Sequence, residues 1–191
     1  HAIPLEMDQY RRCFATHRVP RLHRDEVVTA TGSRHIAVLI DGQAHYMGVD
    51  LHNGTATVAA IQNALDQIVD AVTTQDGSAM APGMLSALPR AVWAEQRGEL
   101  LKDSQNQQTL FLLEKALFVV CLDIDTAPGS LGGLSANLRD GNCHNRFYDK
   151  SMQIIITENG KAGLCSERAA VDGSVALRFA AVFQDVIFIP Y

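Results

Sequence analysis

Several features that reveal a function quickly are missing from this 191-residue sequence. The longest apolar runs, ALFVVCL and VALRFAAVF, fall far short of the ~20 residues needed to span a bilayer, so we expect no transmembrane segment. An excess of positive charge is also absent: the formal net charge is −5, which argues against a nucleic-acid partner. With 47% apolar and 19% charged residues, the composition is that of a globular domain.

Patterns typical of disulfides, metals and phosphate loops are missing as well. The four cysteines, Cys13, Cys121, Cys143 and Cys165, are scattered without a CxxC pair, which favours reduced thiols and an intracellular compartment. No HxxxH or HExxH spacing occurs, so we expect no metal site. The stretch GSLGG, residues 129–133, lacks the spacing and the lysine of a phosphate-binding loop and is interpreted as a flexible loop.

Local patterns predict an α/β fold with a mixed sheet, built from hairpins and flanked by helices. Asp41-Gly42 and Asn159-Gly160 each separate two strand-like runs and predict tight hairpin turns. Residues 57–72 carry apolar side chains at helical spacing, and Thr57 is suited to be the N-cap. The other predicted elements are a short helix running into a loop over 7–27, helices over 91–102, 108–120 and 172–186, and loops over 73–89 and 123–140.

The second hairpin contains three consecutive isoleucines, residues 154–156, which are typical of a strand covered on both faces. The two predicted hairpins supply only about four strands. We therefore expect the chain to belong to a larger sheet or to rest against a partner.

Three stretches resemble the carnitine/choline O-acyltransferase family: LEKALFVVCLD (113–123), GNCHNRFYDKSMQIIITENGKAGL (141–164) and SERAAVDG (166–173). The second resembles the family signature GNxxNRWFDK, and the third aligns with the family's catalytic segment EHxxx[DE][GA]. Residues 4–20 and 33–51 also resemble family stretches, in the same order. We interpret residues 1–191 as a single partial domain of this family.

The resemblance implies a partial fold of the chloramphenicol acetyltransferase type, in which two similar α/β halves enclose a tunnel. Family enzymes move an acyl group between CoA and carnitine. Their histidine removes the proton of the carnitine hydroxyl, and a carboxylate four residues later orients that histidine.

At the aligned histidine position this chain has Arg168, whereas Asp172 keeps the orienting carboxylate. An arginine stays protonated and cannot act as a base. Three interpretations are open: an Arg168–Asp172 salt bridge in the old site, a solvated surface pair, or an altered site in which Arg168 stabilises an anion while another group is the base. His144, the nearest imidazole in the sequence, is interpreted as an ordinary loop histidine, and Cys165 as a small core residue.

Four polar residues of the signature, Asn142, Asn145, Arg146 and Asp149, precede a predicted strand. We interpret them as a buried network of hydrogen bonds and ion pairs that fixes the loop. The resemblance implies the same, since the signature supports the family's site from behind. Trp93 is expected to pack in the core.

These observations predict a degenerate, non-catalytic carnitine acyltransferase-like protein with a structural or interaction role, as a subunit of a mitochondrial assembly. Peroxisomes are the alternative location. The resemblance places the family's CoA-binding and carnitine-binding segments beyond the matched part. We therefore expect no cofactor, and the missing segments argue against a third possibility, a module that binds CoA or an acyl chain without chemistry. The expected partners are other protein subunits or a complementary acyltransferase half. The alternative function is one piece of an active carnitine O-acyltransferase.

Overall fold

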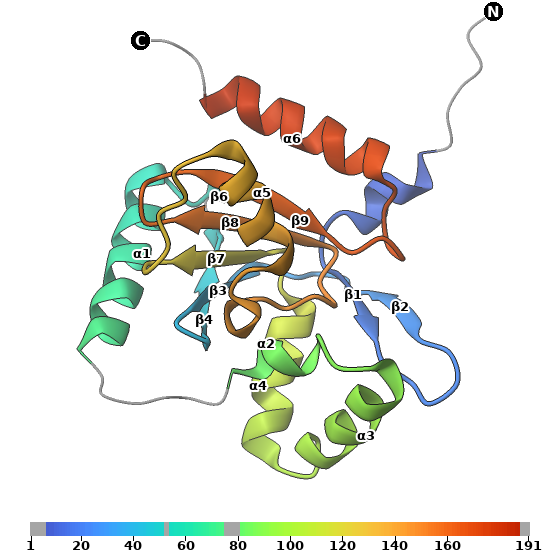
Figure 1. The fold of residues 1–191 in the computed structure, drawn as a ribbon. Coiled ribbons are helices and arrows are strands. Elements are labelled where there is room, and N and C mark those ends of the chain that lie inside the picture. The colour runs from blue at the N-terminus through green and yellow to red at the C-terminus, as the bar shows by residue number, and fades with distance from the viewer. Residues whose placement is uncertain (1–6, 52–53, 75–80, 188–191) are drawn as a thin grey trace, which may run out of the picture.

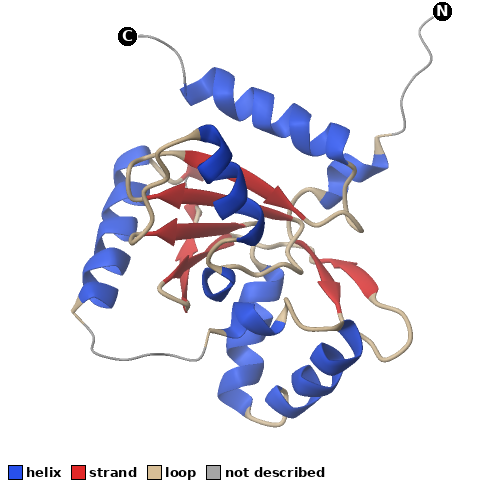
Figure 2. Cartoon of the chain, viewed as in Figure 1, coloured by secondary structure: helices blue, strands red, loops and turns tan. Residues whose placement is uncertain are grey.

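A five-stranded mixed sheet forms the centre of the fold in the computed structural model, which describes residues 7–51, 54–74 and 81–187. The strand order is β4-β3-β7-β8-β9, with antiparallel pairs at the two edges and parallel pairs in the middle. Figure 1 shows the sheet between helices, and Figure 2 shows the same layers by structure type. The five strands are β3 (His35–Ile40), β4 (Gln43–Gly48), β7 (Val119–Asp123), β8 (Met152–Thr157) and β9 (Ala162–Ser166).

Both predicted hairpins are confirmed. Asp41 and Gly42 join β3 to β4 with φ angles of 46° and 71°, the left-handed conformations that a two-residue hairpin turn requires. Gly160, with a φ of 74°, lies in the turn between β8 and β9. Along β3, Ala37 and Leu39 enter one buried cluster while Ile36 and Val38 enter another, so the strand is covered on both faces.

The helix predicted over 57–72 is also confirmed as α1 (Val58–Thr73), and the Thr57 hydroxyl accepts a hydrogen bond from the Ala60 amide at 3.2 Å. The predicted apolar face packs on the sheet through Ile61, Leu65 and Ile68. Val58, the first apolar residue of the predicted face, is 85% exposed, because the helix begins beyond the edge of the buried cluster.

The helix predicted over 108–120 is correct only in its first part. The chain forms α4 (Ser104–Lys115), leaves helical geometry at Ala116 with ψ 147°, and continues as strand β7. Because β7 lies between two parallel neighbours, it is apolar on both faces, and periodicity alone does not separate such a run from a buried helix.

Residues 7–27 contain more regular structure than predicted. Only η1 (Asp8–Arg12) is helical, and a second two-stranded sheet follows, formed by β1 (Thr16–Val19) and β2 (Glu26–Thr29). An antiparallel bridge from His17 to Lys150 attaches β1 to the signature region. The strands were missed because their residues are mostly polar and do not alternate.

The loop predicted over 123–140 is wrong in its second half, which forms α5 (Leu131–Asp140). Ser130 caps this helix by accepting a hydrogen bond from the Gly133 amide at 3.0 Å. The glycines of GSLGG therefore lie at a helix start, where the serine cap outweighs their low helix propensity.

The remaining elements complete the covering layers. Helices α3 and α6 confirm the predictions over 91–102 and 172–186, and Trp93 is fully buried. Residues 75–80 of the predicted loop lie outside the described part of the chain. No helix in the described ranges is long and apolar enough to cross a membrane. These elements are β5 (Asp50–Leu51), β6 (Gly54–Thr55), α2 (Pro82–Leu85), α3 (Arg90–Leu100), η2 (Cys143–Asn145) and α6 (Gly173–Ile187).

Candidate functional site

The signature loop, residues 141–150, is anchored by a buried ion pair at the end of strand β7. Both guanidinium Nη atoms of Arg146 donate to the carboxylate of Asp123, at 2.8 and 2.7 Å, and both side chains are fully buried. Asn145 and Asn137 donate to the same carboxylate at 3.0 and 2.9 Å. Burial alone raises the pKa of Asp123, but these hydrogen bonds outweigh it and hold the pKa below its ordinary value.

Asn145 also connects the loop to two strands. Its Nδ2 donates to the Leu122 carbonyl at 3.0 Å, and its Oδ1 accepts from the Gly42 amide at 3.4 Å. Asn142 contributes less, because its role here is a backbone carbonyl that accepts from the Asn145 amide at 2.9 Å. Asn145 and Arg146 thus lie in one buried network, while Asn142 is only at its margin.

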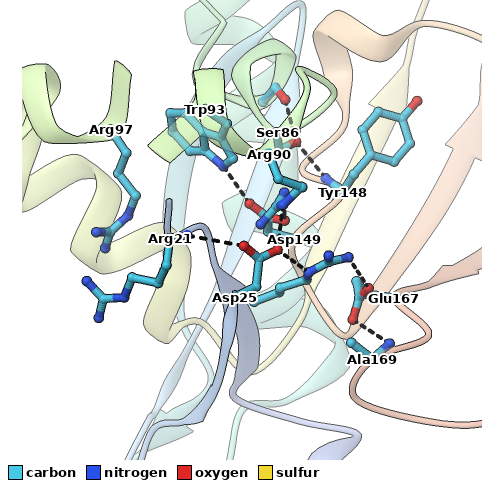
Figure 3. Close-up of polar contacts among 12 residues, drawn as sticks. Arg21, Asp25, Ser86, Arg90, Trp93, Arg97, Tyr148, Asp149, Glu167 and Ala169 are labelled. Carbon is cyan, nitrogen blue, oxygen red and sulfur yellow. Dashed lines mark hydrogen bonds and ion pairs between the residues drawn. The ribbon is translucent and has the colours of Figure 1, made fainter. Parts of the chain in front are cut away.

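Asp149 lies in a second buried network. One of its oxygens accepts from Arg90 and the other from the Trp93 indole, each at 2.6 Å (Figure 3). Burial outweighs these favourable contacts and raises the pKa of Asp149. Asp149 thereby joins helix α3 to the signature loop.

From Arg90 the ion pairs continue toward the aligned catalytic segment. Arg90 donates to Asp25 at 2.6 Å; both side chains are labelled in Figure 3. Arg18 donates to the same oxygen of Asp25 at 2.6 Å and also to Glu167 at 3.2 Å. Charges of opposite sign thus alternate from the buried indole to the residue before Arg168. This connection was not predicted, since its members are up to 149 residues apart in the sequence.

Glu167 holds the turn that follows strand β9. Its Oε2 accepts from the amides of Ala169 and Ala170, at 2.8 and 3.2 Å, while its Oε1 accepts from Arg18. The Glu167 side chain is 10% exposed. One carboxylate therefore satisfies two amides of the turn and connects the turn to the ion-pair chain.

Arg168 itself is exposed in this turn, and in the part of the chain that the structure describes it makes no hydrogen bond or ion pair. Residues 168–170 form a turn rather than a helix, so the i, i+4 salt bridge to Asp172, the first of the three interpretations, is not formed. The charge of Arg168 still contributes to lowering the pKa of Asp172. Asp172 is exposed and accepts from the Gly173 amide and, at 3.1 Å, from the Ser174 hydroxyl. These contacts at the start of α6 lower its pKa.

The other two candidates have ordinary surroundings. His144 Nε2 lies 3.3 Å from an oxygen of Asp41, at the turn between β3 and β4. Cys165 is half-buried against the main core, and burial raises the pKa of its thiol. The Cys165 thiol is not activated as a nucleophile, because a raised pKa makes the reactive thiolate rarer.

Sequence reasoning missed a third buried group of charged residues around Glu114. The carboxylate accepts two hydrogen bonds from Arg97, at 2.9 and 3.0 Å, and lies 3.6 Å from His17 Nε2. Lys150 donates to the Glu114 carbonyl at 2.7 Å. Burial lowers the pKa of Lys150 to about 7, and burial with the nearby cations lowers that of His17 to about 3. Lys150 ends the signature match, which was the available signal.

Beside the exposed turn lies a small pocket of about 210 Å³. Its wall consists of Gln9 and Arg12 from η1 and of residues 168–172. Gln9 Oε1 accepts from the Asp172 amide at 2.7 Å and closes one end. Among the described residues no cluster of histidine, cysteine, aspartate or glutamate could hold a metal ion.

The sequence of this chain is similar to known proteins over nearly its whole length. The family model described as Choline/Carnitine o-acyltransferase matches residues 1–189. Carnitine O-palmitoyltransferase 2, mitochondrial, of Rattus norvegicus is 36% identical over 187 residues, which are 97% of this chain and 28% of the relative. A putative mitochondrial carnitine O-acetyltransferase of Saccharomyces cerevisiae is 34% identical over 215 residues, covering 96% of this chain and 31% of the relative.

The chain thus spans less than a third of the length of these relatives. The match nevertheless extends over nearly all of it, including the signature loop and the turn of Arg168. The mixed sheet with its flanking helices agrees with part of an acyltransferase fold. The chain therefore belongs to the choline/carnitine O-acyltransferase family.

Proposed function

We propose that this chain is a carnitine acyltransferase-like domain that does not catalyse acyl transfer and has a structural or interaction role. The observation that carries the proposal is the exposed guanidinium of Arg168, at the position that the family resemblance gives to a proton acceptor. A guanidinium stays charged at physiological pH and cannot take the hydroxyl proton. The buried networks around Asp123 and Asp149 support a structural role, because they hold the fold together without needing a catalytic base.

The interaction role is supported by apolar side chains on helix α6. Leu177 is 72% exposed and Val182 is 50% exposed on this helix, at the start of which Asp172 lies. Each of these apolar side chains is available for contact with a protein partner. The names of the relatives include a mitochondrial location, so we propose a mitochondrial assembly as the setting.

The second candidate is one piece of an active carnitine O-acyltransferase. It is favoured by the extent of the family match and by the complete side-chain support of the turn through Glu167. In this case a base other than residue 168 accepts the proton.

Release of CoA thiol separates the two candidates. The purified chain is incubated with acetyl-CoA or palmitoyl-CoA and L-carnitine, and an active carnitine acyltransferase in a parallel sample shows that the assay works. We expect no release above the rate without carnitine. Turnover that saturates with carnitine contradicts the proposal and favours the second candidate.

The interaction role has its own test. On a native gel of a mitochondrial extract, we expect the chain to migrate in a complex larger than itself, and Leu177→Asp to shift it toward the monomer. Leu131→Asp is the matched control, because Leu131 is 83% exposed on another helix, α5. A chain that migrates as a monomer in the unmodified extract contradicts the role.

A further inference from the structure

We propose that the pocket beside Arg168 binds a small oxyanion, a carboxylate or phosphate group, through the guanidinium groups of Arg168 and Arg12. The inference rests on the proposed function, in which the turn carries no base, and it assigns a ligand class to the same place. Four features of the pocket support it: an unpaired cation, a second cation in the same wall, a fixed backbone and a matching size.

Arg168 is the unpaired cation. It is exposed and makes no hydrogen bond or ion pair within residues 7–51, 54–74 and 81–187. A guanidinium presents several N–H donors in one plane, and that geometry matches the two oxygens of a carboxylate or phosphate. Its full donor set is therefore available to a ligand.

Arg12 supplies the second cation in the same wall. Its guanidinium forms a surface ion pair with Asp8, with 2.5 Å between Nη2 and Oδ2 and both side chains 46% exposed. Exposed pairs of this kind contribute little and exchange readily. Arg12 can therefore turn toward an anion without the loss of a buried contact.

The backbone of the pocket is fixed before any ligand binds. Glu167 accepts from Ala169 and Ala170, and Gln9 accepts from the Asp172 amide. The blue turn near the N-terminus and the start of the red helix α6 lie side by side in Figure 1, as the Gln9 contact requires. A wall that does not reorganise lowers the entropic cost of binding.

The size of the pocket restricts the ligand. At about 210 Å³ it is smaller than the ~300–1,000 Å³ of sites for drug-sized molecules. It suits a group of a few heavy atoms, with Ala169, Ala170 and Val171 as the apolar part of the wall. Asp172 is the opposing charge: its carboxylate accepts hydrogen bonds from Gly173 and Ser174 at the start of α6, and it also attracts Arg168 electrostatically without forming an ion pair with it.

The test is a titration of the ¹⁵N-labelled chain with inorganic phosphate and, separately, with acetate at constant ionic strength. We expect saturable shifts of the amides of residues 169–171 with at least one anion. Arg168→Ala is expected to weaken binding about tenfold or more, because it removes a charge-assisted donor. Arg24→Ala, a change of an exposed arginine outside the pocket, is expected to leave binding unchanged.

Asp172→Asn sharpens the test. Asparagine is an equally good helix cap, so the start of α6 is retained while the opposing charge is removed, and we expect tighter anion binding. Absence of saturable shifts with both anions overturns the inference, as does equal binding by Arg168→Ala. These outcomes are distinct from failure of the proposed function, which is seen as thiol release in the absence of added phosphate or acetate.

Discussion

The signature loop and the turn of Arg168 are connected through Arg18, but their arginines have opposite surroundings. In the loop, Arg146 is fully buried and both of its Nη atoms are bound to Asp123. In the turn, Arg168 is exposed and, among the described residues, forms neither a hydrogen bond nor an ion pair. The same residue type is thus a structural cross-link in one region and an available cation in the other.

The largest expected effect on stability comes from breaking the buried Arg146–Asp123 ion pair of the signature loop. Arg146→Ala leaves the carboxylate of Asp123 buried without its counter-ion, and we expect the free energy of unfolding to fall by about 3–5 kcal/mol. Urea denaturation measures it. The double change Asp123→Leu with Arg146→Met removes both charges and is expected to recover part of the loss. An Arg146→Ala protein as stable as the unmodified chain would show that the pair does not hold the fold.

A second prediction concerns the buried charges behind the signature loop. The folded-state pKa of His17 is about 3, below its ordinary value of 6.5, because burial and the nearby Lys150 and Arg97 disfavour the imidazolium. As the pH falls below 6.5 the unfolded chain takes up a proton that the folded chain does not, so stability is lost on acidification.

The matched comparison is with His17→Gln, which has no titrating imidazole. From pH 7 to pH 5 we expect the unmodified chain to lose about 2 kcal/mol more of its free energy of unfolding than the variant does. Urea denaturation at the two pH values measures the difference. Equal losses in both proteins would mean that His17 is protonated in the fold.

A smaller loss of stability is expected from removing Arg18, which connects the signature loop to the turn of Arg168. Arg18→Ala removes the ion pairs to Asp25 and Glu167, and because Arg18 is 32% exposed we expect a loss of only about 1 kcal/mol. The amides of Ala169 and Ala170 should exchange faster with deuterium, since Glu167 loses its anchor. Arg21→Ala is the control in the same hairpin, because Arg21 pairs with Glu26 at the surface. Faster exchange in both variants would argue against a connection through Arg18.

Local signals were sufficient for much of the fold. The turn at Asp41-Gly42 and the cap at Thr57 depend on residues within three positions of each other, and both were predicted correctly. Strand β7 was missed because its apolar residues fit a buried helix equally well. The strands β1 and β2 pair directly with each other and were missed because their residues are mostly polar and do not alternate.

The site shows the same limit. The sequence indicated that Arg146 and Asp149 belong to buried networks, but it could not name Asp123, Arg90 or Trp93 as their partners. Those contacts join elements that are separated along the chain by 23 to 59 residues. The sequence likewise could not decide whether Arg168 is exposed, since the same spacing suits a helical salt bridge and a solvated turn.

We infer that the signature loop holds the fold together and that the turn of Arg168 does not. The most direct measurement is the free energy of unfolding of Arg168→Ala in urea, beside that of Arg146→Ala. We predict a change within about 0.5 kcal/mol for Arg168→Ala, as for other surface substitutions without contacts. A loss of about 2 kcal/mol or more would contradict the claim, because it would place Arg168 in a supporting network like that of Arg146.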